Sequence, residues 1–349
     1  MSRITRTQAL LKSGEALYVT DLTNIAYLCR FEGSFGSLVV TKSSATLFTD
    51  SRYALKAKNE TVDVDIDVNG HHIPPVEVFE DGITVLFEKT HVSVELYERL
   101  QNAWPRLTLV GRSGLVEGLR IVKDSQEIDA IRRASAISIQ ALTETIKSVR
   151  AGQTELQIQR ILESTMIDLG ADGIAFDSIV ATGPHSAIPH HSPTLRILEA
   201  GDLLKIDFGA AVNGYKSDCT RTFVIGPPSQ WQLDIHKQVL AAQSAGRGAI
   251  CDGASISEVN RLARQAMTNP EFAATFKHGL GHGVGLAIHE DPFFSANSTA
   301  KIESGMVITI EPGIYLAGRG GVRIEDTIVV TPHGYENLTE FSYDLISLG

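Results

Sequence analysis

Two aspartates, Asp207 and Asp218, lie in a stretch that the sequence predicts to be a β-hairpin. Asn213-Gly214 separates two apolar-rich runs and is a typical two-residue turn. With that turn Asp207 faces Thr220, and the two aspartates share one face of the ribbon on a diagonal of roughly 7–8 Å. Carboxylates so placed repel each other unless one or two hard cations lie between them. The alternative is a solvated edge ribbon that carries two surface acids.

Two further acids follow in the last third of the chain. Residues 306–312 read as an apolar strand that ends at Glu311, and residues 320–330 read as another strand that contains Glu325. Burying a glutamate in such a strand costs several kcal/mol unless the carboxylate is paired or bound to metal. Arg323 could pair with one of the two glutamates, which would leave the other without a partner.

Histidines accompany these acids. His278, His282 and His289 lie among four glycines, and an upstream loop of residues 183–193 carries His185, His190 and His191. The glycines do not have the order of a dinucleotide-binding loop. Four carboxylates with one imidazole suit Mn(II), Co(II), Fe(II) or Zn(II) in a paired site, rather than a thiolate zinc site or a copper site. No His-Glu-x-x-His motif is present, so the single-zinc protease plan is not supported.

The elements that must position these residues fall into two parts. Residues 1–120 alternate short apolar runs with helical segments, which predicts an α/β domain with strands near 16–20, 37–41, 45–49, 83–87 and 107–110. Residues 121–349 begin with two helices whose N-terminal capping patterns start at Asp124 and Thr154. Strands and turns follow, interrupted by two helices near 233–245 and 255–267. No ligand-like cluster occurs in the first part.

Composition narrows the class of protein. The chain has 349 residues, a hydrophobic fraction of 43% and a formal net charge of -10. Such an acidic balance argues against nucleic acid and anionic membranes as partners. No apolar run approaches the roughly 18–20 residues that span a bilayer. Three widely spaced cysteines predict neither a disulfide framework nor a zinc site, and a cytoplasmic location is expected.

The sequence resembles the pita-bread metallopeptidases, and among them the Xaa-Pro peptidases, prolidase and aminopeptidase P. The resemblance extends over nearly the whole chain, including an N-terminal domain of the creatinase type. Cys29-Arg30 and Cys219 depart from the usual pattern. The motifs that carry the resemblance are Asp207-Phe208-Gly209, Ser217-Asp218-Cys219-Thr220-Arg221-Thr222, His278-Gly279-Leu280-Gly281-His282, His289-Glu290, Glu311-Pro312-Gly313 and Arg323-Ile324-Glu325-Asp326.

The resemblance implies a fold and a role for each motif residue. The expected fold is an α/β domain over 1–120 followed by an α+β pita-bread catalytic domain over 121–349. The residues implied as metal ligands are Asp207, Asp218, His282, Glu311 and Glu325. His190 and His289 would flank the scissile bond, and Glu311 would also shuttle a proton. The residues implied as substrate contacts are His190, His278, His289, Tyr315 and Arg323, of which Arg323 could instead orient an acidic ligand.

The same resemblance implies the cofactor and the reaction. Two divalent ions per chain are expected, Mn²⁺ first, with Co²⁺ and Zn²⁺ as alternatives. The expected substrate is a short proline-containing peptide, and the expected assembly is a homodimer. The compact chain favours an Xaa-Pro dipeptidase, with aminopeptidase P as the close alternative. A non-catalytic binding protein, a metal-free amidinohydrolase and a methionine aminopeptidase fit less well, the first two because all five ligands are present.

Overall fold

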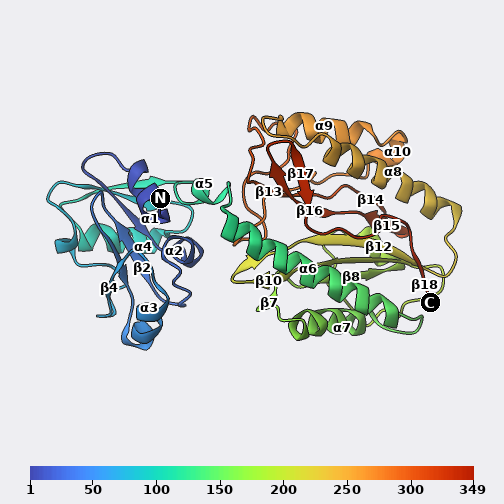
Figure 1. Ribbon diagram of the computed structural model, residues 1–349, viewed down its shortest axis with the longest axis horizontal. Helices are drawn as coiled ribbons and strands as arrows, with labels where there is room; N and C mark the ends of the chain where they lie inside the picture. The colour runs from blue at the N-terminus through green and yellow to red at the C-terminus, as the bar shows by residue number, and fades with distance from the viewer. The chain divides into compact units, whose positions relative to one another are not determined.

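A computed structural model describes residues 1–349. The chain forms two compact units, residues 1–120 and residues 121–349 (Figure 1). The architecture confirms the expected combination of an α/β N-terminal part and a second part of helices and small sheets.

The N-terminal unit is built on a six-stranded sheet with the order β4-β3-β2-β1-β5-β6. Its core includes an edge-to-face pair between Tyr18 and Trp104, whose ring centroids are 5.2 Å apart. The strands are β1 (Glu15–Val19), β2 (Ser37–Val40), β3 (Ala45–Phe48), β4 (Asp65–Asp67), β5 (Thr84–Glu88) and β6 (Thr108–Arg112), and the helices are α1 (Arg3–Leu10), α2 (Leu22–Cys29), α3 (Ala54–Glu60), α4 (Val94–Ala103) and α5 (Glu117–Arg120).

The helices of the second unit begin where the capping patterns predict. Asp124 and Thr154 each form a capping box, with Glu127 and Gln157 respectively, at the starts of α6 and α7. The helices are α6 (Ser125–Ser148), α7 (Glu155–Asp168), α8 (Gln230–Gly248), α9 (Ile256–Gln265) and α10 (Pro270–Ala273).

Four small sheets lie between these helices (Figure 1). Apolar side chains of α6 and α7 pack on β8, β9 and β12, and those of α8 and α9 pack on β13, β15 and β16. The sheets have the orders β11-β10-β7, β18-β12-β9-β8, β13-β16-β17 and β14-β15. The strands are β7 (Gly173–Ile174), β8 (Ile179–Thr182), β9 (Leu203–Phe208), β10 (Ala210–Val212), β11 (Tyr215–Lys216), β12 (Cys219–Ile225), β13 (Val307–Ile310), β14 (Gly313–Leu316), β15 (Gly320–Arg323), β16 (Asp326–Thr331), β17 (Gly334–Asn337) and β18 (Ser347–Leu348).

The hairpin around Asn213-Gly214 has the predicted register. Val212 pairs with Tyr215 and Asp207 pairs with Thr220. Both turn residues have positive φ, 51° at Asn213 and 76° at Gly214, as a two-residue hairpin turn of this kind requires. The hairpin is divided into two strand pairs, β9 with β12 and β10 with β11. The interruption between the two pairs lies next to Asp207 and Asp218. The continuous strand expected over 320–330 is wrong, because the chain leaves β15 after Arg323 and enters a different sheet as β16.

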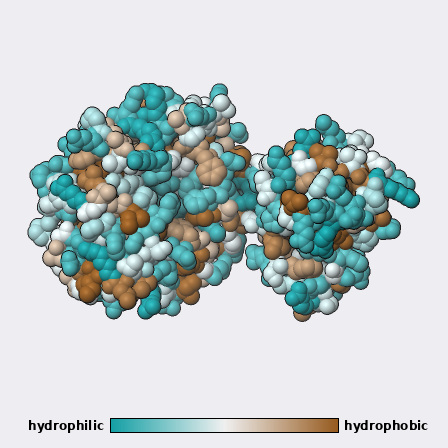
Figure 2. Space-filling model, turned by 180° about the vertical axis from the view of Figure 1, so that it is seen from behind, coloured by the Kyte–Doolittle hydropathy of each residue, from teal (hydrophilic) through white to brown (hydrophobic).

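None of the helices combines the length and the hydropathy that a transmembrane helix requires. On the face shown in Figure 2, hydrophilic residues cover much of the surface and hydrophobic residues are scattered among them.

Candidate metal centre

All five predicted ligands line one cavity of about 310 Å³ in the second unit: Asp207, Asp218, His282, Glu311 and Glu325. They come from β9, the residue before β12, the glycine-rich segment before β13, the residue after β13, and the break between β15 and β16. The four acids therefore lie at or next to strand ends, and the backbone of His282 is hydrogen-bonded to Thr309 of β13.

Backbone pairing explains why His282 and Glu311 meet. The amide of Thr309 donates to the His282 carbonyl and that of Glu311 donates to the Leu280 carbonyl, both at 2.8 Å. This close approach requires glycine beside the histidine, because a Cβ on Gly281 would lie 2.0 Å from the Thr309 carbonyl oxygen. The result is a distance of 3.3 Å between His282 Nε2 and Glu311 Oε1.

The break between β15 and β16 places Glu325. The Glu325 amide donates to the Thr220 carbonyl at 3.1 Å, and the Thr220 hydroxyl donates to Glu325 Oε2 at 2.6 Å. Ligand atoms of Asp218, His282 and Glu325 lie within 4.8 Å of one another. The break in the strand predicted over 320–330 thus helps to form the site, because the chain bends at Glu325 and a continuous strand would not.

The protein balances only part of the negative charge in this cavity, through Arg323 beside Asp207 and His282 beside Glu311. Burial and then the neighbouring carboxylates, Glu325 foremost for Asp218 and Glu311 foremost for Glu325, raise the pKa of both acids well above the usual range. Asp207 Oδ1 is buried and has no hydrogen-bond partner. A group of acids in this state gains stability from a bound cation.

The shorter of two contacts of His282 has the spacing expected between atoms that share an ion. His282 Nε2 lies 3.6 Å from Asp218 Oδ2 and 3.3 Å from Glu311 Oε1. Atoms that each lie ~2.1 Å from one ion are separated by roughly 3.0–3.4 Å. Burial lowers the pKa of His282, but the hydrogen bond and charge of Glu311, together with smaller contributions from Gly283 and Asp207, outweigh it and the net shift is upward. Burial likewise raises the pKa of Glu311, and the same histidine reverses that shift. The oxygen-rich set with one imidazole fits divalent ions of the Mn²⁺ to Zn²⁺ range.

The predicted substrate-contact residues form two groups. His190 and His289 line the cavity of the acids, and the His289 ring packs edge-on against His282 with centroids 4.4 Å apart. Burial and the nearby His282 lower the pKa of His289, which keeps this imidazole neutral near pH 7.

The second group is a hydrogen-bonded chain. The Tyr315 hydroxyl lies 3.0 Å from His278 Nε2 and accepts from Arg323 Nη1 at 2.9 Å. Arg323 Nη2 forms an ion pair with Asp207 Oδ2. Arg323 therefore pairs with an aspartate and with neither glutamate, so it holds a candidate ligand in place. Burial, opposed only in part by Arg323, raises the pKa of Tyr315 to about 12.

Comparison with known proteins identifies the family. Residues 129–332 match the model of metallopeptidase family M24, and residues 3–122 match the creatinase/prolidase N-terminal domain. The chain belongs to metallopeptidase family M24. It is therefore a hydrolase with the pita-bread fold of this family, and the family implies divalent metal ions.

Relatives of this M24 peptidase cover it almost end to end. The "Uncharacterized peptidase YqhT" of Bacillus subtilis is 36% identical over 340 residues, 96% of each chain. The solved Xaa-Pro dipeptidase from Bacillus anthracis is 34% identical, covers 99% of each chain and superposes with a TM-score of 0.94. The X-Pro aminopeptidase from Thermotoga maritima, also 34% identical, covers 98% of this chain and 100% of its own, with a TM-score of 0.90.

Sequence reasoning missed two buried charged residues near the site of this M24 peptidase. Lys205 is fully buried in β9, where its ammonium group donates to the carbonyls of Ile188 at 2.6 Å and Pro189 at 3.3 Å. A lysine inside the apolar run 203–206 was a usable signal. Glu155, at the start of α7, was read only as part of a helix start, because its partners lie about 30 to 40 residues away in the sequence.

Proposed function

We propose that this M24 peptidase hydrolyses Xaa-Pro peptide bonds at a dinuclear metal centre made by Asp207, Asp218, His282, Glu311 and Glu325. The observation that carries the proposal is the convergence of all five side chains on one cavity in which the protein leaves the negative charge of Asp218 and Glu325 without a cationic partner. Residues 121–349 would form the catalytic domain and residues 1–120 the N-terminal domain. The Xaa-Pro activity named for the Bacillus anthracis relative supports the substrate class.

Each of the residues in the cavity would have its own role in the reaction. Two divalent ions, when bound, activate water and polarise the substrate carbonyl. Glu311 is held ionised beside His282 and can accept a proton from the attacking water and pass it to the proline nitrogen. The neutral His289 can donate an N–H bond to the oxyanion that develops on the carbonyl. His190, on the same cavity, would hold the other end of the scissile bond.

The leaving group sets a particular demand. The Xaa-Pro bond is a tertiary amide without an N–H, so the nitrogen must be protonated as the bond breaks while the pyrrolidine ring is held in an apolar or aromatic pocket. Glu311 supplies the proton, and Phe176, Ile179 and Ile288 contribute apolar surface to the cavity.

Substrate length separates two candidate activities. The cavity of about 310 Å³ at the acids lies at the lower end of the range of ~300–1,000 Å³ in which proteins hold small molecules, which suits a dipeptide. A larger cavity of about 880 Å³ adjoins it and shares His190, and it is also lined by His278 and Tyr315. That room favours the second candidate, an Xaa-Pro aminopeptidase that accepts longer peptides.

The test compares three peptides under each of Mn²⁺, Co²⁺ and Zn²⁺: an Xaa-Pro dipeptide, an Xaa-Pro-Yaa tripeptide and an Xaa-Ala control. Cleavage of the dipeptide supports a dipeptidase, and cleavage of the tripeptide alone supports an aminopeptidase. Preference for the Xaa-Ala control under every metal contradicts proline specificity.

We further propose that Mn²⁺ is the resident ion, that the protein is a homodimer and that it is cytoplasmic. The three free cysteines fit the cytoplasmic location. Metal analysis, solution mass and cell fractionation test these in turn.

A further inference from the structure

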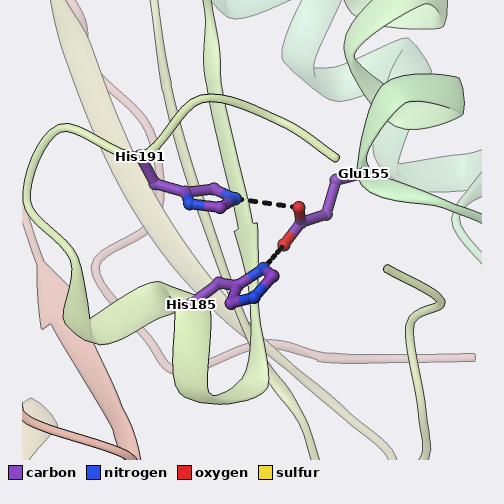
Figure 3. Close-up of side chains that lie close together, drawn as sticks. All are labelled: Glu155, His185 and His191. Carbon is purple, nitrogen blue, oxygen red and sulfur yellow. Dashed lines mark hydrogen bonds and ion pairs between the residues drawn. The ribbon is translucent and has the colours of Figure 1, made fainter. Parts of the chain in front are cut away.

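Glu155 is a buried carboxylate that accepts hydrogen bonds from several donors, and Figure 3 shows two of them, His185 and His191. Its Oε1 accepts from the amide of Thr182 at 2.8 Å, the hydroxyl of Thr182 at 3.1 Å and Nδ1 of His185 at 2.9 Å. Its Oε2 accepts from Nε2 of His191 at 2.8 Å, the amide of Thr194 at 2.9 Å and the hydroxyl of Thr194 at 2.7 Å. One side chain thus binds six donors.

These donors bracket the segment 182–194, which we call the histidine loop. Thr182 and Thr194 are its two ends, His185 and His191 lie inside it, and His190 of the candidate active site directly precedes His191. Because a single carboxylate binds both ends and two interior side chains, Glu155 closes the loop.

The opposite side of the histidine loop is tied to the metal centre. The ammonium group of Lys205 and the guanidinium of Arg323 both donate to the carbonyl of Pro189, at 3.3 Å each. Arg323 in turn pairs with Asp207. The loop is therefore held between Glu155 and a candidate metal ligand, with His190 next to Pro189.

Glu155, His185 and His191 also have the composition of a metal site, and their ligand atoms lie within 4.8 Å of one another. The geometry favours a cluster held together by hydrogen bonds, without a metal ion. The two histidine-to-carboxylate distances of 2.8 and 2.9 Å are those of N–H···O hydrogen bonds. Burial raises the pKa of Glu155, but the bonds from His191, Thr182 and Thr194 outweigh it and lower the value to about 2. The negative charge is satisfied without a cation.

We propose that Glu155 is a positioning residue that fixes the histidine loop and so holds His190 at the metal centre. The part of this inference that concerns activity rests on the proposed function, whereas the part that concerns the loop does not. In Glu155→Gln one oxygen becomes an NH₂ group that faces three donors, so half of the hydrogen bonds are lost.

Hydrogen–deuterium exchange on the metal-free protein tests the loop directly. We expect the amides of 182–194 to exchange faster in Glu155→Gln than in the wild type. Glu144→Gln is the matched control, because Glu144 is exposed on α6 and pairs only with Lys147. Unchanged exchange in Glu155→Gln overturns the proposal. If that variant does not fold, His185→Ala removes one donor from a half-exposed residue, and faster exchange near 183–187 is then the expected result.

A double-mutant cycle with His190→Ala tests the link to catalysis. Glu155→Gln should lower kcat by ~10–100-fold, the usual cost of losing a residue that orients an active-site group. In the His190→Ala background it should cost less than ~3-fold, since Glu155 acts through His190. Equal effects in both backgrounds overturn the proposal, and loss of a bound ion from Glu155→Gln would show that the cluster is a metal site instead. If the wild type cleaves no Xaa-Pro peptide, the proposed function fails while the exchange experiment still decides the role of the loop.

Discussion

Two buried clusters of acid and histidine in the second unit of this protein have opposite electrostatic environments. At the candidate metal centre four carboxylates share a cavity, and the pKa values of Asp218 and Glu325 are raised by burial and repulsion from neighbouring carboxylates. Glu155 is equally buried, yet six donors surround it and its pKa is lowered to about 2. Both groups contain histidine and acid within ligand distance. The two clusters therefore differ in unbalanced charge and not in the proximity of ligand types, and unbalanced charge is the feature that favours binding of a cation.

Removing a ligand from the unbalanced group should have the largest effect. Asp218→Ala and Glu325→Ala are each expected to lose bound metal and to lower kcat/KM for an Xaa-Pro peptide by more than ~10³-fold. Elemental analysis of the purified variants beside a peptidase assay measures both quantities. Metal content equal to that of the wild type in both variants contradicts the assignment.

Substitutions of His282 and His289 should separate a metal ligand from a neighbouring residue that acts on the substrate. His282→Ala should lose metal because His282 lies 3.3 to 3.6 Å from two acids, whereas His289→Ala should keep its metal and lose ~10²–10³ in kcat as a removed oxyanion donor. Metal content and kcat are measured on the same preparations. Loss of metal from both variants to the same degree shows that the roles are assigned wrongly.

Replacing glutamate by glutamine should change the stability of the metal-free protein in opposite directions at Glu155 and at Glu325. Glu155→Gln removes bonds that an ionised carboxylate accepts and should lower the free energy of unfolding by ~3 kcal/mol near pH 7, as the shift from 4.5 to about 2 implies. Glu325→Gln relieves repulsion and should raise the stability of the metal-free protein. Chemical denaturation in a chelator measures both changes, and a change of the same sign in both contradicts the comparison.

The pH dependence of these two changes should also be opposite. Because the folded-state pKa of Glu155 is depressed, its contribution is present above pH 4.5 and is lost as pH falls towards about 2, so the gap between the wild type and Glu155→Gln should narrow over that window. The pKa of Glu325 is raised, so its destabilising effect appears as pH rises, and the advantage of Glu325→Gln should grow with pH. Unfolding curves across pH give both trends, and a gap for Glu155→Gln that stays constant down to pH 2 counts against the assignment.

Local signals predicted the frame of the site well. The Asn213-Gly214 turn set the register that puts Asp207 opposite Thr220, because hairpin pairing follows from the turn itself. Capping patterns located the starts of α6 and α7 for the same reason, since the residues concerned are three apart.

Long-range contacts account for what the sequence did not predict. The change of sheet between Arg323 and Asp326 depends on pairing with β14 and β13, which periodicity along residues 320–330 does not reveal. The role of Glu155 depends on donors about 30 to 40 residues away, so its position in a helix start was the only local signal.

A count of bound ions tests the central claim most directly. Metal-free wild type, Glu155→Gln and Glu325→Gln are each titrated with Mn²⁺ and the ions per chain are measured. We expect about two ions in the wild type, the same number in Glu155→Gln and fewer in Glu325→Gln, because the cation-binding capacity belongs to the group with unbalanced charge. Full binding by Glu325→Gln, or a loss confined to Glu155→Gln, would contradict this account.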